Sequence, residues 1–185
     1  VGPNGTVRDV EFDNLTIKGQ TEAGGIVSSN FGTIRNVTVE GSVSVSATPS
    51  SSIAVAGGIV AEHGSFTTDE GRDGNIINSS VDVSISGGTI GGVAGRVREG
   101  SSVTNSSATG SVNTTIGDYT STETGGLVGD LSGNITGSSA ATVVNGDKNV
   151  GGLAGENGGW IIQSTASGSV SGSKLIGGLA GDNGG

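Results

Sequence analysis

The chain of 185 residues contains no cysteine, no methionine and two prolines, with one tryptophan, one tyrosine and three phenylalanines. Without cysteine, disulfides, thiolate metal sites and cysteine nucleophiles are excluded. A compact globular core normally depends on aromatic and long aliphatic side chains, and these are scarce. The apolar residues are mainly Val, Ile and Ala, which suit the interior of a narrow β structure.

Basic residues and long apolar runs are also few. Eight Lys and Arg stand against 17 Asp and Glu, a net charge of −9, which disfavours nucleic-acid binding because that requires a basic patch. No apolar run approaches the about 20 residues of a membrane span, and no signal segment opens the chain. We expect any signal or anchor to have been removed or to lie outside these residues.

Glycine, in contrast, is abundant at 38 residues, and it recurs in pairs. The pairs stand at residues 24–25, 57–58, 91–92, 125–126, 151–152 and 177–178, so their spacings are 33, 34, 34, 26 and 26. The unit is therefore 26 residues long. Insertions at residues 47–55, 65–74 and 114–124 lengthen the first three spacings, as expected where loops leave a stacked core.

Apolar residues keep a fixed register with the glycine pairs, counted from the second glycine as position 0. Positions 12, 14, 16 and 18 alternate with polar residues, which indicates a strand with one buried face. Position 16 is glycine at 41, 110 and 168, where we expect opposite walls to come close. The apolar sets are Ile26, Ile59, Val93, Leu127, Leu153 and Leu179 at position 1; Ile34, Ile76, Val103, Ile135 and Ile161 at position 9; Val39, Val81, Ala108, Ala140 and Ala166 at position 14; and Val43, Ile85, Val112, Val144 and Val170 at position 18.

Short strands on a fixed period predict an all-β parallel β-helix, or β-solenoid, with each unit forming one coil. We expect about 26 residues per coil, roughly six to seven coils stacked about 4.8 Å apart, and a right-handed course by analogy with most such coils. Residues 1–185 would form one repeat domain, with units starting near the six glycine pairs. In the partial first coil (residues 1–23), GTVRDV at 5–10 matches GTIRNV at 32–37.

The repeated phrase GG[LIV][VA]G-x-N-x-G-x-I-x-[NQ]-S-x-[AV]-x-G-x-V resembles the GLUG repeat. It is most faithful at residues 125–140 and 151–170, whereas GGIVSSNFG (24–32) and GGIVAEHG (57–64) lack the third glycine. That repeat occurs in large bacterial and archaeal surface proteins, including filamentous adhesins and non-catalytic stalks of some IgA-cleaving peptidases. The resemblance implies a β-solenoid and brings no catalytic or binding residues with it.

Acidic residues recur at position 4, in Glu62, Asp130, Glu156 and Asp182. In the last three coils they would stack about 5 Å apart, where like charges repel. A Ca²⁺ ion bound by Asp130, Glu156 and Asp182 would relieve this repulsion. The alternative is ordinary turn chemistry with solvated carboxylates.

Asn-x-Ser/Thr sequons are frequent, and three of them share position 11. In an archaeal or eukaryotic protein they predict surface glycosylation. The alternative is that asparagine serves there as a turn residue that tolerates left-handed backbone. The candidate residues are Asn4, Asn14, Asn36, Asn78, Asn105, Asn113 and Asn134.

The single histidine and the single tryptophan are weaker candidates. His63 lies beside Glu62 and before an acidic loop, but one histidine without partners at ligand spacing favours an exposed loop residue over a metal ligand. Trp160 could stack on a sugar; we expect it instead to cover the outer wall or to pack beneath a loop.

We find no catalytic constellation, and the few basic residues are scattered. The sequence therefore predicts a non-enzymatic extracellular stalk or adhesin segment, with residues 65–74 and 114–124 as its contact loops. The expected partner is a cell-surface or matrix ligand. The second hypothesis is a filament subunit that stacks end to end with copies of itself through its open ends. The third is a polysaccharide-active enzyme. No cofactor is expected other than Ca²⁺.

Overall fold

The structure, a computed structural model, describes residues 1–46, 54–65, 73–115 and 122–184. Within these ranges all regular structure is β-strand, and no segment forms a helix. Accordingly, among these residues there is no helix of the length and apolarity that crossing a membrane requires. This agrees with a sequence rich in glycine and β-branched residues, which disfavour helices.

The strands form three sheets, in which every pair of neighbours is parallel. The first sheet contains β1 (Thr6–Gly19), β4 (Thr33–Val45), β7 (Asn75–Ile77), β8 (Ser80–Gly87), β11 (Ser102–Thr104), β12 (Ser107–Thr114), β15 (Asn134–Thr136), β16 (Ser139–Asn145), β19 (Trp160–Ile162), β20 (Thr165–Ser167) and β21 (Val170–Ser171). The second contains β2 (Glu22–Gly24), β5 (Val55–Gly57), β9 (Thr89–Gly91), β13 (Glu123–Gly125), β17 (Asn149–Gly151) and β22 (Ile176–Gly177). The third contains β3 (Val27–Asn30), β6 (Val60–His63), β10 (Ala94–Val97), β14 (Val128–Leu131), β18 (Ala154–Asn157) and β23 (Ala180–Asn183).

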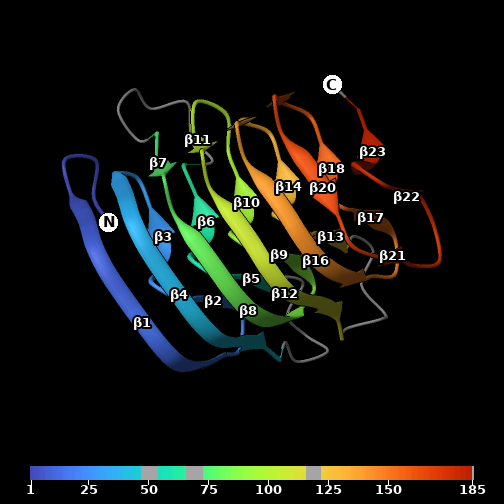
Figure 1. Cartoon of the computed structure of the whole chain (residues 1–185), viewed down its shortest axis with the longest axis horizontal. Helices are drawn as coiled ribbons and strands as arrows, with labels where there is room; N and C mark the ends of the chain where they lie inside the picture. Colours follow the sequence, from blue (N-terminus) through green and yellow to red (C-terminus); the bar gives the residue numbers. More distant parts are fainter. Residues whose placement is uncertain (47–53, 66–72, 116–121, 185) are drawn as a thin grey trace.

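The chain is a parallel β-helix, as the repeat predicts. Each coil passes from the second sheet to the third and then through the first, and Figure 1 shows the long strands β1, β4, β8, β12 and β16 lying side by side. The glycine pairs stack in register: Gly24 faces Gly57, which faces Gly91, and Gly125 faces Gly151. Strand β1 pairs with β4 from Thr6 against Thr33 onward, which confirms the match between residues 5–10 and 32–37.

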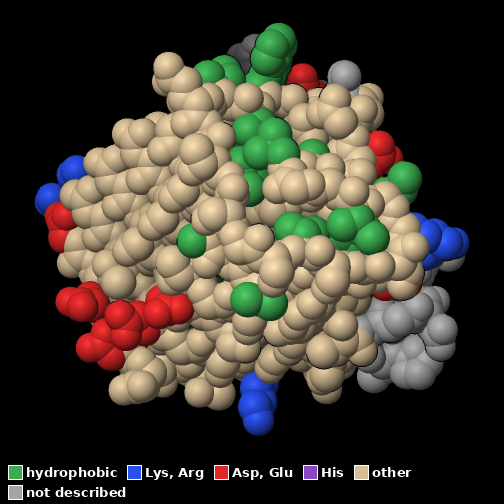
Figure 2. Space-filling model, turned by 45° about the vertical axis from the view of Figure 1, so that its right-hand side comes forward, with side chains coloured by type: hydrophobic (Ala, Val, Ile, Leu, Met, Phe, Trp, Pro, Cys, Tyr) green, Lys and Arg blue, Asp and Glu red, His purple; other side chains and the backbone are tan. Residues whose placement is uncertain are grey.

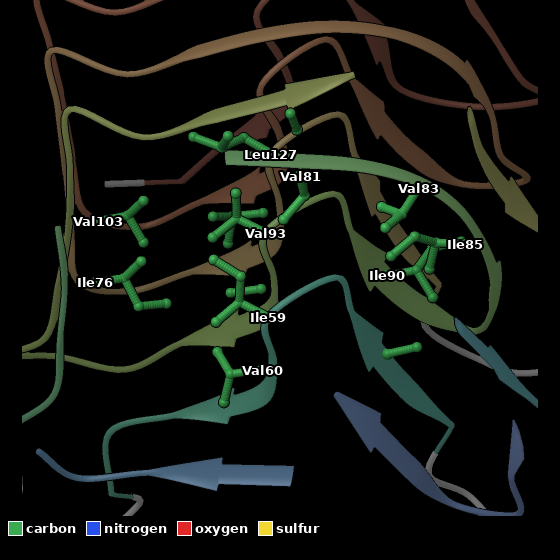
Figure 3. Close-up of a cluster of buried hydrophobic side chains, with 14 of the residues drawn as sticks. Ile59, Val60, Ile76, Val81, Val83, Ile85, Ile90, Val93, Val103 and Leu127 are labelled. Carbon is green, nitrogen blue, oxygen red and sulfur yellow. The ribbon is translucent and has the colours of Figure 1, made fainter. Parts of the chain in front are cut away.

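The four predicted apolar positions form ladders inside the coil. Figure 3 shows Ile59, Val93 and Leu127 in one column and Ile76 below Val103 in another. In the first column the backbone N–H of Ile59 donates to the carbonyl of Val93, and that of Val93 to the carbonyl of Leu127, at 2.9 and 2.8 Å. In the central coils these side chains are fully buried. Burial of such apolar surface, at roughly 25 cal/mol per Å², is the main stabilising contribution.

The glycine pairs are required by close backbone contacts. A Cβ on Gly125 would lie 1.8 Å from the carbonyl oxygen of Val128, in the corner that the same coil makes. A Cβ on Gly126 would lie 2.1 Å from the carbonyl oxygen of Gly152, in the next coil. The first glycine therefore permits the corner and the second permits coil stacking. At position 16, Gly110 has a φ of +97°, and the atom its Cβ would meet is the carbonyl oxygen of Val83 in the preceding coil rather than an opposite wall.

A serine ladder, consisting of Ser79, Ser106, Ser138 and Ser164, supports the corner after position 11. The hydroxyl of Ser106 donates to the carbonyl of Thr104 at 2.9 Å and accepts the backbone N–H of Ser79 at 3.2 Å. The same pair of bonds recurs in the next coil, where Ser138 accepts the N–H of Ser106 at 3.1 Å. The hydroxyls thus satisfy backbone groups that would otherwise be buried without partners.

The three insertions fall at corners, as predicted. The described residues exclude 47–53, 66–72 and 116–121. Most of each predicted contact loop (65–74 and 114–124) therefore lies outside them. The described ends correct the predicted bounds, because Val55 begins β5 and Glu123 and Thr124 belong to β13, with all three residues buried.

Candidate functional site

The third sheet presents a ladder of charged residues at position 4. We call Glu62, Arg96, Asp130, Glu156 and Asp182 the charged ladder, because each faces the next in register; the uncharged Ser29 precedes Glu62 in the same column. The predicted stacking of Asp130, Glu156 and Asp182 is therefore confirmed. Arg96, four residues after Gly92, occupies the same position between Glu62 and Asp130 and was not among the predicted residues.

Two arginines neutralise the first half of the charged ladder. Arg96 Nη1 lies 2.9 Å from Glu62 Oε1, and its Nε lies 3.7 Å from Asp130 Oδ2. Arg98 Nη2 lies 3.0 Å from Glu62 Oε2, and its Nη1 lies 3.5 Å from Asp130 Oδ2. The side chains of Arg96 and Glu62 retain 18% and 8% of their exposure, so these ion pairs are largely shielded from water. Their geometry indicates a structural role, since both carboxylates are occupied by guanidinium groups.

The second half of the ladder is acidic. Burial raises the pKa of Glu156, and the nearby carboxylates of Asp130, Glu123 and Asp182 raise it further. The carboxamide of Asn149 opposes this by donating a hydrogen bond from Nδ2 to Glu156 Oε2 at 3.1 Å. The stack therefore has the repulsion predicted from the sequence, which is strongest at its centre.

The calcium site at Asp130, Glu156 and Asp182 stays a prediction. The structure brings the three carboxylates onto consecutive strands of one face. Across the described ranges, however, no three His, Cys, Asp or Glu side chains gather closely enough to hold a metal ion.

The expectation that His63 lies in an exposed loop is wrong. His63 ends β6, its side chain has no exposure, and burial lowers its pKa to about 4. Its Nε2 lies 3.1 Å from the carbonyl oxygen of Ser102, so Nε2 carries the hydrogen. Nδ1 is then free to accept a hydrogen bond from Asn30 Nδ2 at 3.1 Å. The imidazole is therefore a neutral core residue with both nitrogens bonded, unsuited to bind a metal.

The asparagines at position 11 turn the chain. Asn36, Asn78 and Asn105 have φ values of 52°, 50° and 48°, in the left-handed region that asparagine tolerates better than most residues. Asn14 shares this conformation at 55°. These observations bear out the turn role; they leave glycosylation untested.

The sequons differ in accessibility. Asn113 and Asn134 are half-buried, and the carboxamide oxygen of Asn113 accepts a hydrogen bond from Asn145 Nδ2 at 2.8 Å. The five other sequon asparagines are exposed, namely Asn4, Asn14, Asn36, Asn78 and Asn105. Glycosylation remains a prediction for all seven, with better access at these five.

Trp160 lies on the outer face of β19 and is 70% exposed. It covers the outer wall, and among the described residues no segment packs over it. A groove of about 470 Å³ lies beside it, lined by Glu99, Gly100, Ser132, Gly133, Asn134, Gly158, Gly159 and Trp160. No sequence pattern marks this groove, because it is made by turns of three different coils.

Two comparisons relate the chain to known proteins. The family model of the GLUG motif matches residues 86–113, which include β9 to β11 and all but the last residue of β12. A putative immunoglobulin A1 protease from Bacteroides ovatus has a similar structure, with a TM-score of 0.65 and 22% sequence identity. The match covers 94% of this chain and 60% of that one, and at this identity it shows the fold alone. None of the curated proteins matches the sequence. The chain is thus a β-helix repeat protein that carries the GLUG motif.

Proposed function

We propose that this chain is a non-enzymatic structural and adhesive repeat domain, forming part of a rigid stalk at the cell surface. The observation that carries the proposal is the unbroken stacking of coils from β1 to β23. Each coil bonds to its neighbours through backbone ladders and through the serine ladder, and each buries its apolar ladder against the next. A solenoid of this kind resists bending because every coil is supported on both sides.

The GLUG motif supports the extracellular location, because it is a motif of surface and secreted proteins. The surface composition is consistent with it. Figure 2 shows a face made mainly of polar side chains and backbone, on which apolar side chains form only small separate patches. Such a surface suits a solvated stalk whose contacts with a cell-surface or matrix ligand are local.

A protease function is not proposed, although the structural neighbour is named as a putative protease. The chain spans 60% of that protein at 22% identity. The only histidine of the sequence is His63, whose ring nitrogens are both bonded in the core. It therefore cannot serve as the general base that a serine protease requires. Incubating the purified chain with immunoglobulin A1 should leave the antibody intact, and cleavage would contradict the non-enzymatic assignment.

The location is tested by immunolabelling. An antibody raised against the purified chain should label intact cells of the source organism as strongly as permeabilised cells. Brief protease treatment of intact cells should remove the signal, while a cytoplasmic marker protein survives. Labelling that depends on permeabilisation would refute the surface location.

The stalk role is tested mechanically. Stretching a single tethered chain should unfold it in steps of one coil, from 26 to 34 residues or roughly 90 to 120 Å of extended chain. A single low-force event, with no steps of coil size, would refute a load-bearing rod.

A further inference from the structure

We propose that the groove beside Trp160 binds one face of a pyranose sugar ring. This inference supplies a ligand class for the adhesive part of the proposed function, and it rests on that function only for its biological use. The groove crosses three consecutive coils at the corner between the third sheet and the short strands β11, β15 and β19. Its volume, about 470 Å³, lies within the range of small-molecule sites.

The groove exists because one turn is longer than its two neighbours. Four residues (98–101) join β10 to β11, whereas two join β14 to β15 (132–133) and two join β18 to β19 (158–159). The longer turn projects as one wall, carrying Glu99, and the indole of Trp160 forms the other. Neighbouring coils are about 4.8 Å apart, so walls two coils apart are separated by about 10 Å. That separation accommodates one sugar ring lying against the indole.

The floor between the walls is backbone. A Cβ on Gly159 would lie 1.9 Å from the carbonyl oxygen of Gly133, and one on Gly133 would lie 2.4 Å from that of Ser101. A side chain at either of these two glycines would therefore collide with the backbone of the preceding coil, which keeps this part of the floor open.

The longer turn is held in place before any ligand binds. The N–H of Ser101 donates to the carbonyl of Arg98 at 3.1 Å, which closes the turn. The Arg98 guanidinium is paired with Glu62 and Asp130. Gly100 has a φ of +80°, a backbone conformation that favours glycine and is strained for other residues. A preformed wall lowers the entropic cost of binding.

The backbone that carries the indole is fixed as well. The main-chain N–H of Trp160 donates to the carbonyl of Gly133 at 3.1 Å, and Trp160 faces Asn134 in the strand register. The next residue, Ile161, joins the interior ladder beside Ile135, so Trp160 points away from the core. Tryptophan is usually well buried in soluble proteins. An indole that is 70% exposed on the lining of a polar groove therefore offers a flat apolar surface to a ligand.

The groove has the chemistry of a sugar site. A pyranose ring has an apolar face of C–H groups and a rim of hydroxyls. The indole suits the face, while the Glu99 carboxylate accepts hydrogen bonds and Asn134 and Ser132 both donate and accept them. A quaternary ammonium ion could use Trp160 and Glu99, but it would leave Asn134 and Ser132 without a role. A sugar uses all four groups.

The indole itself reports binding, because Trp160 is the only tryptophan of the chain. The fluorescence of the purified protein should be titrated with methyl glycosides of neutral hexoses and of N-acetylhexosamines. At least one should change the emission saturably, with a dissociation constant on the order of 1 mM. Tetramethylammonium should cause no saturable change. Failure of the whole sugar panel, or saturation by tetramethylammonium alone, would overturn the proposal.

Variants locate the site when binding to a glycan microarray is measured. Trp160→Ala should reduce binding at least tenfold and Trp160→Phe less, while Glu99→Gln should reduce it a few-fold. The matched control is Ile162→Ala, which alters another exposed apolar residue of the same strand, 46% exposed and outside the groove. Equal loss in that control, or full binding by Trp160→Ala, would refute the site. Loss of sugar binding would leave the immunolabelling result unchanged, so the two proposals can fail separately.

Discussion

The two halves of the charged ladder differ in how the carboxylates of neighbouring coils are separated. In the first half, Arg96 stands between Glu62 and Asp130, so charges alternate and the ion pairs can be partly buried. In the second half, Asp130, Glu156 and Asp182 follow one another without an intervening base. The fold tolerates the acidic half because Asp130, Glu156 and Asp182 are only half-buried, so water can still solvate their carboxylates. The alternating half should therefore stabilise the coils and the acidic half should destabilise them.

Removal of Arg96 should have the largest effect. Arg96→Ala leaves Glu62 and Asp130 largely shielded from water and facing each other across the vacated position, with Arg98 as their remaining cation. We expect a loss of about 3 kcal/mol in the free energy of unfolding, because an orphaned, partly buried charge is costly. Urea denaturation measures it. The control is Arg8→Ala, which breaks an exposed ion pair with Asp9 and should cost under about 0.5 kcal/mol. Equal losses in the two variants would contradict the comparison.

Acid should destabilise the first half through His63. The pKa of His63 is lowered to about 4 in the folded protein, so between pH 6.5 and 4 only the unfolded chain binds the proton. The contribution of the neutral His63 to the free energy of unfolding is therefore complete above pH 6.5. It decreases as the pH falls towards 4, by about 3 kcal/mol in total.

His63→Leu isolates this contribution, because leucine already occupies the equivalent position at Leu131 in β14. As the pH falls from 7 to 4.5, the free energy of unfolding of the wild type should decrease more than that of His63→Leu. The variant should therefore gain stability relative to the wild type. Parallel pH profiles of the two proteins would show that His63 is not neutral in the fold.

Neutralising the centre of the acidic half should stabilise the protein slightly. Glu156→Gln removes the repulsion from Asp130 and Asp182 and can still accept the hydrogen bond of Asn149. We expect a rise in melting temperature corresponding to about 0.5 kcal/mol at low salt, decreasing with added salt. The control is Glu11→Gln, an exposed acid opposite Thr38 that changes the net charge equally. A matching rise in the control would assign the effect to net charge alone.

The smallest expected effect is that of calcium. If the ion occupies the acidic half, millimolar Ca²⁺ should raise the melting temperature of the wild type and a chelator should reverse the rise. Glu156→Gln should abolish the response. A wild-type melting temperature that is the same with calcium and with chelator would exclude the site.

The ladders could be predicted from sequence because their residues repeat with the period of the coil. Val112, for example, is an apolar residue at position 18 of the repeat, as are Ile85 and Val144, and the structure places all three in one column. His63 could not be placed this way. Its position holds Asn30, Val97, Leu131 and Asn157 in other coils, so no chemical pattern marks it as buried.

The candidate sites divide in the same way. Arg96 was readable from the register alone. The groove was not, because Glu99 and Trp160 lie in different coils and meet only through the difference in turn length. A pattern of repeats predicts what the coils share, whereas a binding site arises where one coil departs from its neighbours.

The serine ladder has a direction, and this sets an order for assembly. Each hydroxyl accepts the N–H of the preceding coil, as Ser106 accepts that of Ser79 and Ser138 that of Ser106. During synthesis, a newly formed coil therefore leaves one amide waiting for the serine of the coil that emerges next. Each coil is completed by its successor, so the growing end is always the least stable part. A coil without its serine would leave this amide of the preceding coil without its side-chain acceptor.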